Sequence, residues 1–141
     1  MTTLRLNREF FVRHLGVAVL FFGMACWFGY DGYVAYPQRG DEWFEAQHLR
    51  RDNAIRRQKE FMILAFLASA LVGGHLWAVS RLRFSFDDEG YVHDGRRTAY
   101  GDIKTVDRSK WEKKGIVKVD GITLDAWHHA GVREFEKKLK S

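Results

Sequence analysis

Apolar residues in this chain form two long runs, and the remainder alternates between polar and apolar positions. The run from Phe61 to Ser80 has twenty residues and no charge. A helix rises about 1.5 Å per residue, so this run matches the roughly 30 Å hydrocarbon core of a bilayer. A core helix of a soluble domain would carry a polar stripe, whereas only Ser69 and His75 interrupt this run. The pattern predicts a transmembrane helix.

The first apolar run extends from His14 to Tyr36 after a short basic lead. A signal peptide is the alternative interpretation, because basic residues precede an apolar stretch. The stretch is longer than a typical signal core, and bulky aromatic residues stand where small residues mark a cleavage site. We therefore predict a retained first transmembrane helix that Pro37 ends.

The segment between the two runs predicts a third stretch of helix. Asp41 is a suitable N-cap, and residues 41–59 contain neither glycine nor proline. We expect residues 41–60 to be a helical connection that continues into the second span as one helix of about 40 residues. Its arginines either bind lipid phosphates or a partner, or simply form ion pairs on a solvated helix: Arg50, Arg51, Arg56 and Arg57.

Small residues recur on one face of each predicted span. Spacing of this kind lets helix backbones approach closely. The simplest use of both faces is against each other in an antiparallel hairpin, although a second copy or another subunit fits equally well. The predicted helix-packing residues are Ala18, Ala25, Gly29 and Gly32 on the first span, and Ala65, Ser69 and Gly73 on the second.

Beyond Arg81 the apolar period changes to two, which is typical of strands. Turn residues such as Asp94-Gly95 and Gly121 separate the strands, and residues 131–140 predict a final helix with apolar residues on one side. The fold class is therefore an α+β membrane protein: residues 1–80 form the hairpin and residues 81–141 a small antiparallel sheet with a C-terminal helix. The predicted strands are 82–86, 91–93, 98–100, 103–107, 115–120 and 122–125.

The run DDEGYVHDGRRTAYGDIKTVDRSKWEKKGIVKV, within residues 82–140, resembles bacterial pleckstrin-homology-like domains. It has an acidic-Gly turn, a basic-aromatic step into Gly101-Asp102-Ile103 and a later Lys-Gly-Ile hairpin. Such domains often follow a pair of transmembrane helices. The resemblance implies a short form with fewer strands, a half-open sheet capped by a helix, and a role in binding or assembly rather than catalysis.

The composition favours a lipid partner over nucleic acid. The net charge of +5 is spread along the chain, and no nucleic-acid-binding motif accompanies it, so anionic lipid headgroups explain it better. Cys26 is the single cysteine and forms no internal disulfide. Aromatic residues flank the predicted spans as a membrane-interface belt does: Trp27, Tyr30, Tyr33, Tyr36, Trp43 and Trp77.

Ionisable residues near the membrane raise two hypotheses. His14 and His75 fall toward the same face of a hairpin, which permits axial haem ligation, but a histidine hydrogen-bonded between helices or facing headgroups is the simpler interpretation. Asp31 suits a proton relay, yet it lies about 27 Å beyond Arg13 along a helix, at the far interface, where it would cap the turn. We expect no cofactor.

The predicted sheet domain offers two further candidates. Asp125, His128 and His129, with His93, are zinc-ligand types but lack a recognised spacing, so no metal is expected. A basic-aromatic hairpin tip would touch an anionic surface, the alternative being a solvated turn: Lys110, Trp111, Lys113 and Lys114. No nucleophile elbow, phosphate-binding glycine loop or HExxH pattern occurs, so an enzyme is not expected.

Two functional hypotheses follow from these features. The first is a scaffold or accessory subunit that assembles into a homo-oligomer or a larger membrane complex; the second is a sensor of anionic lipid. Basic residues on the two sides of the membrane are nearly equal in number, so the positive-inside rule does not fix the orientation. We expect both termini in the bacterial cytoplasm, because a charged domain of this size is simpler to leave there than to translocate.

Overall fold

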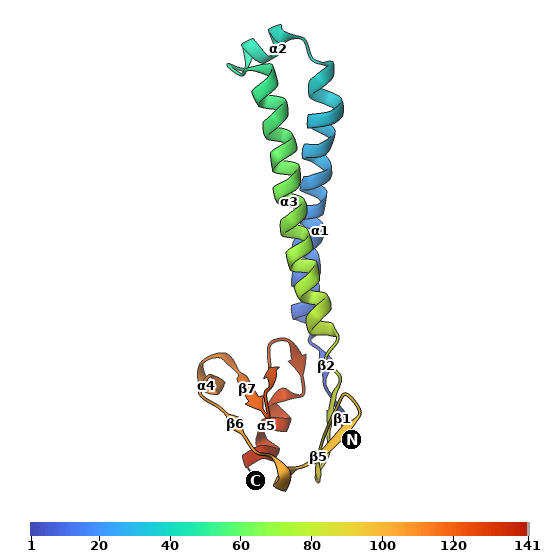
Figure 1. Cartoon of the computed structure of the whole chain (residues 1–141), viewed down its shortest axis with the longest axis vertical. Coiled ribbons are helices and arrows are strands. Elements are labelled where there is room, and N and C mark those ends of the chain that lie inside the picture. The colour runs from blue at the N-terminus through green and yellow to red at the C-terminus, as the bar shows by residue number, and fades with distance from the viewer. Residues whose placement is uncertain (141) are drawn as a thin grey trace. The chain divides into compact units, whose positions relative to one another are not determined.

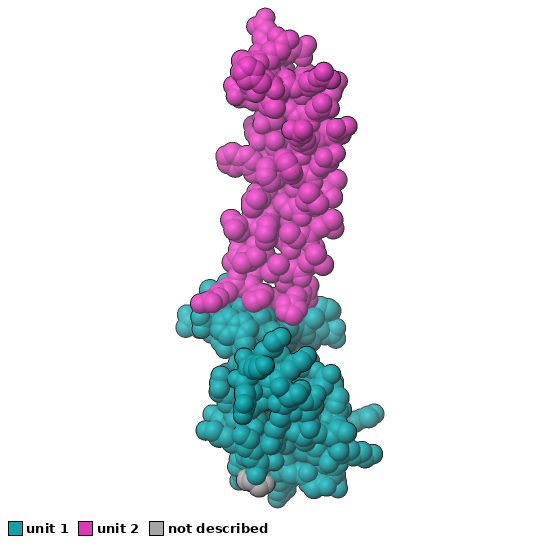
Figure 2. Space-filling view, turned by 90° about the vertical axis from the view of Figure 1, so that its left-hand side faces the viewer, with its two compact units in different colours: residues 1–12, 77–141 teal, residues 13–76 magenta. Residues whose placement is uncertain are grey.

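The computed structural model describes residues 1–140 and divides into two compact units (Figure 2). Residues 13–76 form one unit, which we call the helical hairpin. Residues 1–12 and those from 77 onward form the other, which we call the sheet domain. The chain is therefore α+β, with two long apolar helices and small antiparallel sheets. The hairpin is an insertion in the sequence of the sheet domain.

The hairpin consists of two long helices and a short connection (Figure 1). Helix α1 covers Arg8–Tyr30 and continues through a π-helical turn η1, Asp31–Ala35, and a 3-10 turn η2, Tyr36–Gln38. Helix α2 is Asp41–Ala46, and helix α3 is Arg51–Ser80. Both long helices are long and apolar enough to span a membrane. The first helix thus ends where Pro37 predicted, within one residue.

Helices α1 and α3 pack as an antiparallel pair with a seam repeating every three or four residues. Paired residues run in opposite directions: His14 lies beside His75, and Phe28 beside Phe61. Alternating steps of three and four are the spacing of coiled-coil seams. The less exposed seam positions are His14, Ala18, Phe21, Ala25, Phe28 and Gly32 on α1, and Gln58, Met62, Ala65, Ser69, Val72 and Leu76 on α3.

The prediction of one continuous helix from residue 41 into the second span is wrong. Residues 47–50 break it between α2 and α3. His48 has a φ of 58°, a left-handed conformation that a helix cannot contain. The break lets the ring of Phe44 turn inward, where it is 1% exposed and packs on Tyr36 and Trp43. Burial of this aromatic cluster favours a compact connection over a straight helix.

The sheet domain contains three antiparallel sheets. The first has four strands in the order β1-β3-β4-β5: Thr2–Thr3, Phe84–Phe86, Gly90–His93 and Arg96–Ala99. The second pairs β2, Arg5–Leu6, with β9, His129–Ala130. The third has the order β6-β7-β8: Val106–Asp107, Ile116–Val119 and Ile122–Asp125. Two short helical turns, η3 (Tyr100–Asp102) and α4 (Trp111–Lys114), and the final helix α5 (Val132–Lys140) complete it.

The predicted turns have the expected backbone chemistry. Asp94-Gly95 connects β4 to β5 with φ values of 49° and 82°, and Asp120-Gly121 connects β7 to β8 with 47° and 83°. Two consecutive residues of positive φ make a type I′ turn, whose twist matches that of a hairpin. The six predicted strands and the last helix are confirmed, with ends shifted by one to three residues.

The core of the sheet domain forms around α5. Phe135 is fully buried and contacts the rings of Phe84, Phe86 and Tyr91 at centroid distances of 4.9–5.9 Å. The remaining members come from the N-terminus, from β7 and β8, and from α5 itself: Leu4, Val117, Val119, Leu124 and Val132. Helix α5 therefore closes a core to which residues more than 100 positions apart contribute.

Sequence reasoning missed the N-terminal strands, which it treated as a polar lead. Thr2 and Thr3 pair with Phe86 and Ser85, while β2 pairs with β9. Leu4 between them is 4% exposed and donates its N–H to the Phe84 carbonyl. The alternation of Leu4 and Leu6 with polar residues carries the signal of a strand, but the partner strands lie 80 or more residues away.

Candidate functional site

The hairpin seam is the first candidate site. The Ser69 hydroxyl donates a 2.8 Å hydrogen bond to the Ala18 carbonyl, so a polar contact joins the two helices in an otherwise apolar region. Ala18, Ala25 and Ala65 are buried at this seam. A serine that bonds across helices stabilises their association in an apolar environment. The two small-residue faces therefore contact each other.

Two glycines of α1 and η1 permit the closest approach. A Cβ at Gly29 would lie 2.9 Å from the Met62 sulfur, and one at Gly32 would lie 3.0 Å from Lys59 Cγ and 3.2 Å from its backbone nitrogen. Gly73, the third predicted packing position of α3, has nothing within 4 Å of such a Cβ. Gly29 and Gly32 thus lie at the seam, and Gly73 does not lie at a close contact.

The ionisable residues of the hairpin form local contacts. The rings of His14 and His75 are 5.9 Å apart. Asp31 begins the π-helical turn η1, and the Lys59 ammonium lies 4.5 Å from the Tyr33 ring. Among the described residues no group of three His, Cys, Asp or Glu side chains is placed to hold a metal ion.

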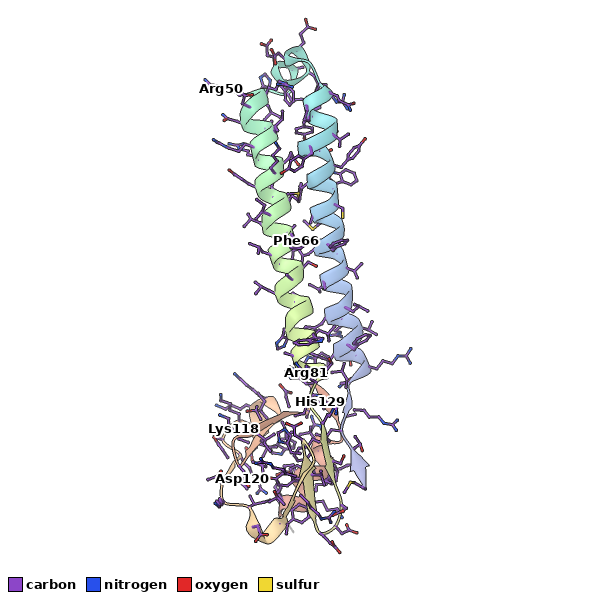
Figure 3. All side chains as sticks on the ribbon, turned by 45° about the vertical axis from the view of Figure 1, so that its right-hand side comes forward. Arg50, Phe66, Arg81, Lys118, Asp120 and His129 are labelled. Carbon is purple, nitrogen blue, oxygen red and sulfur yellow. The ribbon has the colours of Figure 1, made fainter. Side chains whose placement is uncertain are left out.

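Arginines gather where the two long helices are connected. Arg51 donates a 2.9 Å hydrogen bond to the Pro37 carbonyl, and Arg39 stacks on Trp43 at 4.8 Å. Arg50, which Figure 3 labels, and Arg51 line a polar hollow of about 440 Å³ with Asp41, Asp52 and Asn53. Arg56 pairs with Glu60 at 3.6 Å, with both side chains exposed, and Arg57 is exposed. Arg39 and Arg51 therefore stabilise the connection, and the exposed arginines give this end of the hairpin positive charge.

The predicted hairpin tip of the sheet domain is a single helical turn. Helix α4 connects β6 to β7 and ends at Gly115, whose φ of 67° suits glycine at a helix C-terminus. Trp111 packs against the hydrophobic core, so its ring faces inward rather than toward a surface. Lys110, Lys113 and Lys114 remain exposed. The basic character of the predicted tip is kept, but its aromatic part belongs to the core.

A hollow of about 180 Å³ lies beside this turn, on the sheet β6-β7-β8. Lysines and hydroxyls predominate in its lining, which consists of Asp107, Ser109, Lys110, Ile116, Lys118 and Thr123. The Ser109 N–H bonds Asp107 Oδ1 at 2.9 Å and is the main cause of a lowered Asp107 pKa. Two ammonium groups and two hydroxyls suit an anionic group with oxygen acceptors.

Other carboxylates of the sheet domain accept hydrogen bonds from the backbone of nearby turns. Asp120 accepts the N–H groups of Thr105 and Lys104 at 2.9 Å, and these bonds, Thr105 first, lower the pKa of its carboxyl. The Tyr91 hydroxyl donates to the same carboxylate and joins the two larger sheets. Asp87 accepts the N–H of Glu89, which lowers its pKa in the same way. These acids determine loop geometry.

One buried ion pair was not foreseen from the sequence. Glu136 on α5 is 3% exposed, with Arg108 Nε at 3.6 Å and Lys140 Nζ at 3.2 Å. Helical spacing places Glu136 beside the apolar stripe of α5, because it lies four residues after Val132 and three before Leu139. Arg108 covers it from the loop before α4, so the pair connects that loop to α5.

Each histidine of the candidate zinc set has a different partner, so the set does not converge on one point. His129 on β9 is buried, and burial lowers the pKa of its imidazole, which hydrogen-bonds the Val79 carbonyl. His128 lies 3.6 Å from Asp125, while His93 on β4 lies 3.5 Å from Asp94. His129 therefore connects β9 to the last turn of α3. Figure 3 labels His129 and, just after the end of α3, Arg81.

Comparisons with protein-family models, with curated proteins and with solved structures found no match. The functional argument therefore depends on the geometry of the hairpin and the sheet domain.

Proposed function

We propose that this chain is a non-enzymatic integral membrane protein of the bacterial inner membrane. Its hairpin crosses the bilayer twice, and its sheet domain serves in assembly at the membrane surface. The observation that carries the proposal is the outward surface of the hairpin. Large apolar side chains cover it, including Leu20 at 62% exposed, Leu71 at 75% and Trp27 at 71%.

Exposed apolar area of this extent suits lipid. Monomeric soluble proteins rarely expose contiguous apolar patches above a few hundred Å². Within the hairpin, the buried seam positions include Ala18, Ala25 and Ala65, whereas many of the bulky apolar residues face outward. This distribution is expected where the solvent is hydrocarbon and helix association depends on close packing and polar contacts.

Both ends of the hairpin are continuous with the sheet domain, which supports placing both termini on the same side of the bilayer. Strands β1 and β2 precede α1 and pair with β3 and β9, which follow α3. A chain that crosses the bilayer twice leaves both of these segments in the same compartment, where they can form one sheet. We place that compartment in the cytoplasm, since a charged domain of this size is simpler to leave there than to translocate.

The strand arrangement supports a pleckstrin-homology-like domain. Short antiparallel sheets followed by a C-terminal helix agree with the half-open, helix-capped sheet that this resemblance implies. Thr2–Thr3, before the first span, adds a strand to the sheet that β3, β4 and β5 form. The domain is thus divided in the sequence by the hairpin.

An assembly role is consistent with how the polar groups are used. Carboxylates of the sheet domain hold turns, and seam residues hold the hairpin. The remaining surface, lipid-facing helices and a charged sheet domain, is available for a second copy or another membrane protein.

Purification from native membranes in mild detergent tests the proposal. We expect resistance to carbonate extraction, and a defined oligomer or companion proteins by native mass spectrometry. Carbonate release would contradict membrane integration. A monodisperse monomer without companions would contradict the assembly role alone.

A second candidate function, sensing of anionic lipid, is favoured by the hollow lined by Lys110 and Lys118. The full chain purified from membranes should then retain phosphatidylglycerol, detected by native mass spectrometry. Replacing Lys110, Lys113, Lys114 and Lys118 by alanine should remove it, while Lys137→Ala, an exposed control on α5, should not. Equal retention by both variants would exclude this site.

A further inference from the structure

The loop between β8 and β9 is fastened to the first turn of α1. The ring of His128 lies 4.4 Å from the Phe10 ring, and the Trp127 indole meets Phe10 edge-on at 6.3 Å. Asn7, just before α1, donates its N–H to the His128 carbonyl at 2.7 Å. Phe10 is 1% exposed, so the loop covers it. This packing fixes Trp127 beside the beginning of the first apolar helix.

Trp127 nevertheless keeps a large exposed surface. Its side chain is 38% exposed although the residue lies in a well-packed loop. An exposed tryptophan loses favourable apolar burial in water, yet its ring with one N–H is well suited to the boundary between hydrocarbon and water. The exposed face of Trp127 is therefore suited to an amphipathic environment.

Other residues of the sheet domain near the helix ends are also aromatic or basic, as side chains at a membrane interface are. Trp77 in the last turn of α3 is 62% exposed, and the Arg81 guanidinium lies 4.7 Å from its ring. Arg81 and Arg83 line a polar hollow of about 520 Å³ with Ser80 and Asp94. His129 connects this helix end to β9, two residues from Trp127. Aromatic and basic groups thus accompany both helix ends.

The position of Trp127 along the chain agrees with the depth of lipid headgroups. Phe10 precedes Leu15, the first residue of the uncharged run of α1, by five residues, or about 7.5 Å of helix. The headgroup layer on each side of the hydrocarbon core is about 5–7.5 Å thick. Phe10 therefore lies at about the outer edge of this layer, within reach of a large side chain that contacts it.

We propose that Trp127 inserts into the phospholipid headgroup layer beside the helix ends and anchors the sheet domain to the bilayer surface. This inference rests on the proposed membrane insertion of the hairpin. It assigns the LDAWHH segment to lipid contact and makes the domain a fixed part of the membrane surface rather than a tethered module.

Fluorine NMR of the full chain in phosphatidylcholine–phosphatidylglycerol nanodiscs tests the proposal without altering Trp127. The protein is labelled with 5-fluorotryptophan, and each resonance is assigned by a single Trp→Phe substitution. Nitroxide lipids, labelled either at the headgroup or in the acyl chain, then broaden the resonances of nearby rings. Trp111, half-buried in the same unit, is the matched control, and Trp27 on α1 reports insertion.

The headgroup nitroxide should remove the Trp127 signal and leave the Trp111 signal, while the acyl nitroxide removes that of Trp27. Trp127 intensity that persists as well as Trp111 intensity, with Trp27 broadened, would overturn the anchoring and leave membrane insertion intact. Persistence of the Trp27 signal with the acyl nitroxide would overturn both proposals.

Discussion

The hairpin and the sheet domain use apolar residues in opposite ways. In the sheet domain the core contains bulky rings such as Phe84 and Phe86, and Phe135 is fully buried among them. In the hairpin the seam contains alanine, glycine and serine, while Phe66 and Leu71 face outward at 54% and 75% exposed. The reversal supports the proposed insertion of the hairpin into lipid, because water drives bulky apolar groups inward and hydrocarbon does not.

The largest expected difference in unfolding free energy is between alanine substitutions of a buried phenylalanine in the sheet domain and an exposed one in the hairpin. Phe135→Ala should destabilise the sheet domain by about 3–5 kcal/mol, the usual cost of a lost core aromatic. Phe66→Ala should change stability by less than about 0.5 kcal/mol, as expected at an exposed position. Denaturant unfolding of the full chain in detergent, followed by near-UV circular dichroism, measures both. Similar losses would contradict the reversal.

Leu4→Ala tests whether the N-terminus belongs to the core of the sheet domain. We expect a loss of about 2–4 kcal/mol, because Leu4 is buried between β1 and β2. Arg5→Ala, at the neighbouring exposed position, is the control and should have almost no effect. Equal midpoints for the two variants would show that residues 1–6 do not contribute to the core.

Gly32→Val tests the close approach within the hairpin. The added methyl groups would meet Lys59 and Gln58, and overpacking of this kind costs about 1–3 kcal/mol. Gly23→Val is matched, since a Cβ there has nothing within 4 Å. Oxidative crosslinking of an Ala18→Cys, Ser69→Cys pair in a Cys26→Ala background reports hairpin closure. Its yield should fall with Gly32→Val only.

Ser69→Ala removes the hydrogen bond to the Ala18 carbonyl and keeps the side chain small. Such bonds between membrane helices contribute on average about 0.6 kcal/mol, so we expect a small loss of hairpin stability in detergent titration. Ser80→Ala, which removes a bond within one helix, is the control. A loss of several kcal/mol would mean that the seam depends on polar contacts more than on packing.

The smallest effect at neutral pH is expected for Asp120→Asn, which keeps an acceptor oxygen. In the native chain the N–H groups of Thr105 and Lys104 hold the pKa of Asp120 below its usual 3.8. The ionised carboxylate therefore adds stability that is complete above about pH 4 and is lost as the pH falls through the folded pKa. Thermal unfolding between pH 5 and 2 should depend less on pH in the variant. An unchanged slope would contradict this role.

Local patterns in the sequence predicted the elements that depend on neighbouring residues. The uncharged runs predicted α1 and α3, alternation predicted β3, β7 and β8, and Asp94-Gly95 and Asp120-Gly121 occupy the turns expected of them. Each of these depends on hydrogen bonds or φ preferences within a few residues. The candidate seam residues Ala18, Ala25 and Ala65 were found because helix spacing places them on one face.

The sequence by itself determined which segments are helix or strand and which faces carry small or apolar residues. Only the tertiary structure decided that Thr2–Leu6 joins the sheets, that His48 interrupts the expected long helix, and that Trp111 faces the core while Trp127 remains exposed. The physical reason is that these outcomes depend on partners distant in sequence. Strand pairing and core packing select among conformations that local preferences leave nearly equal in free energy.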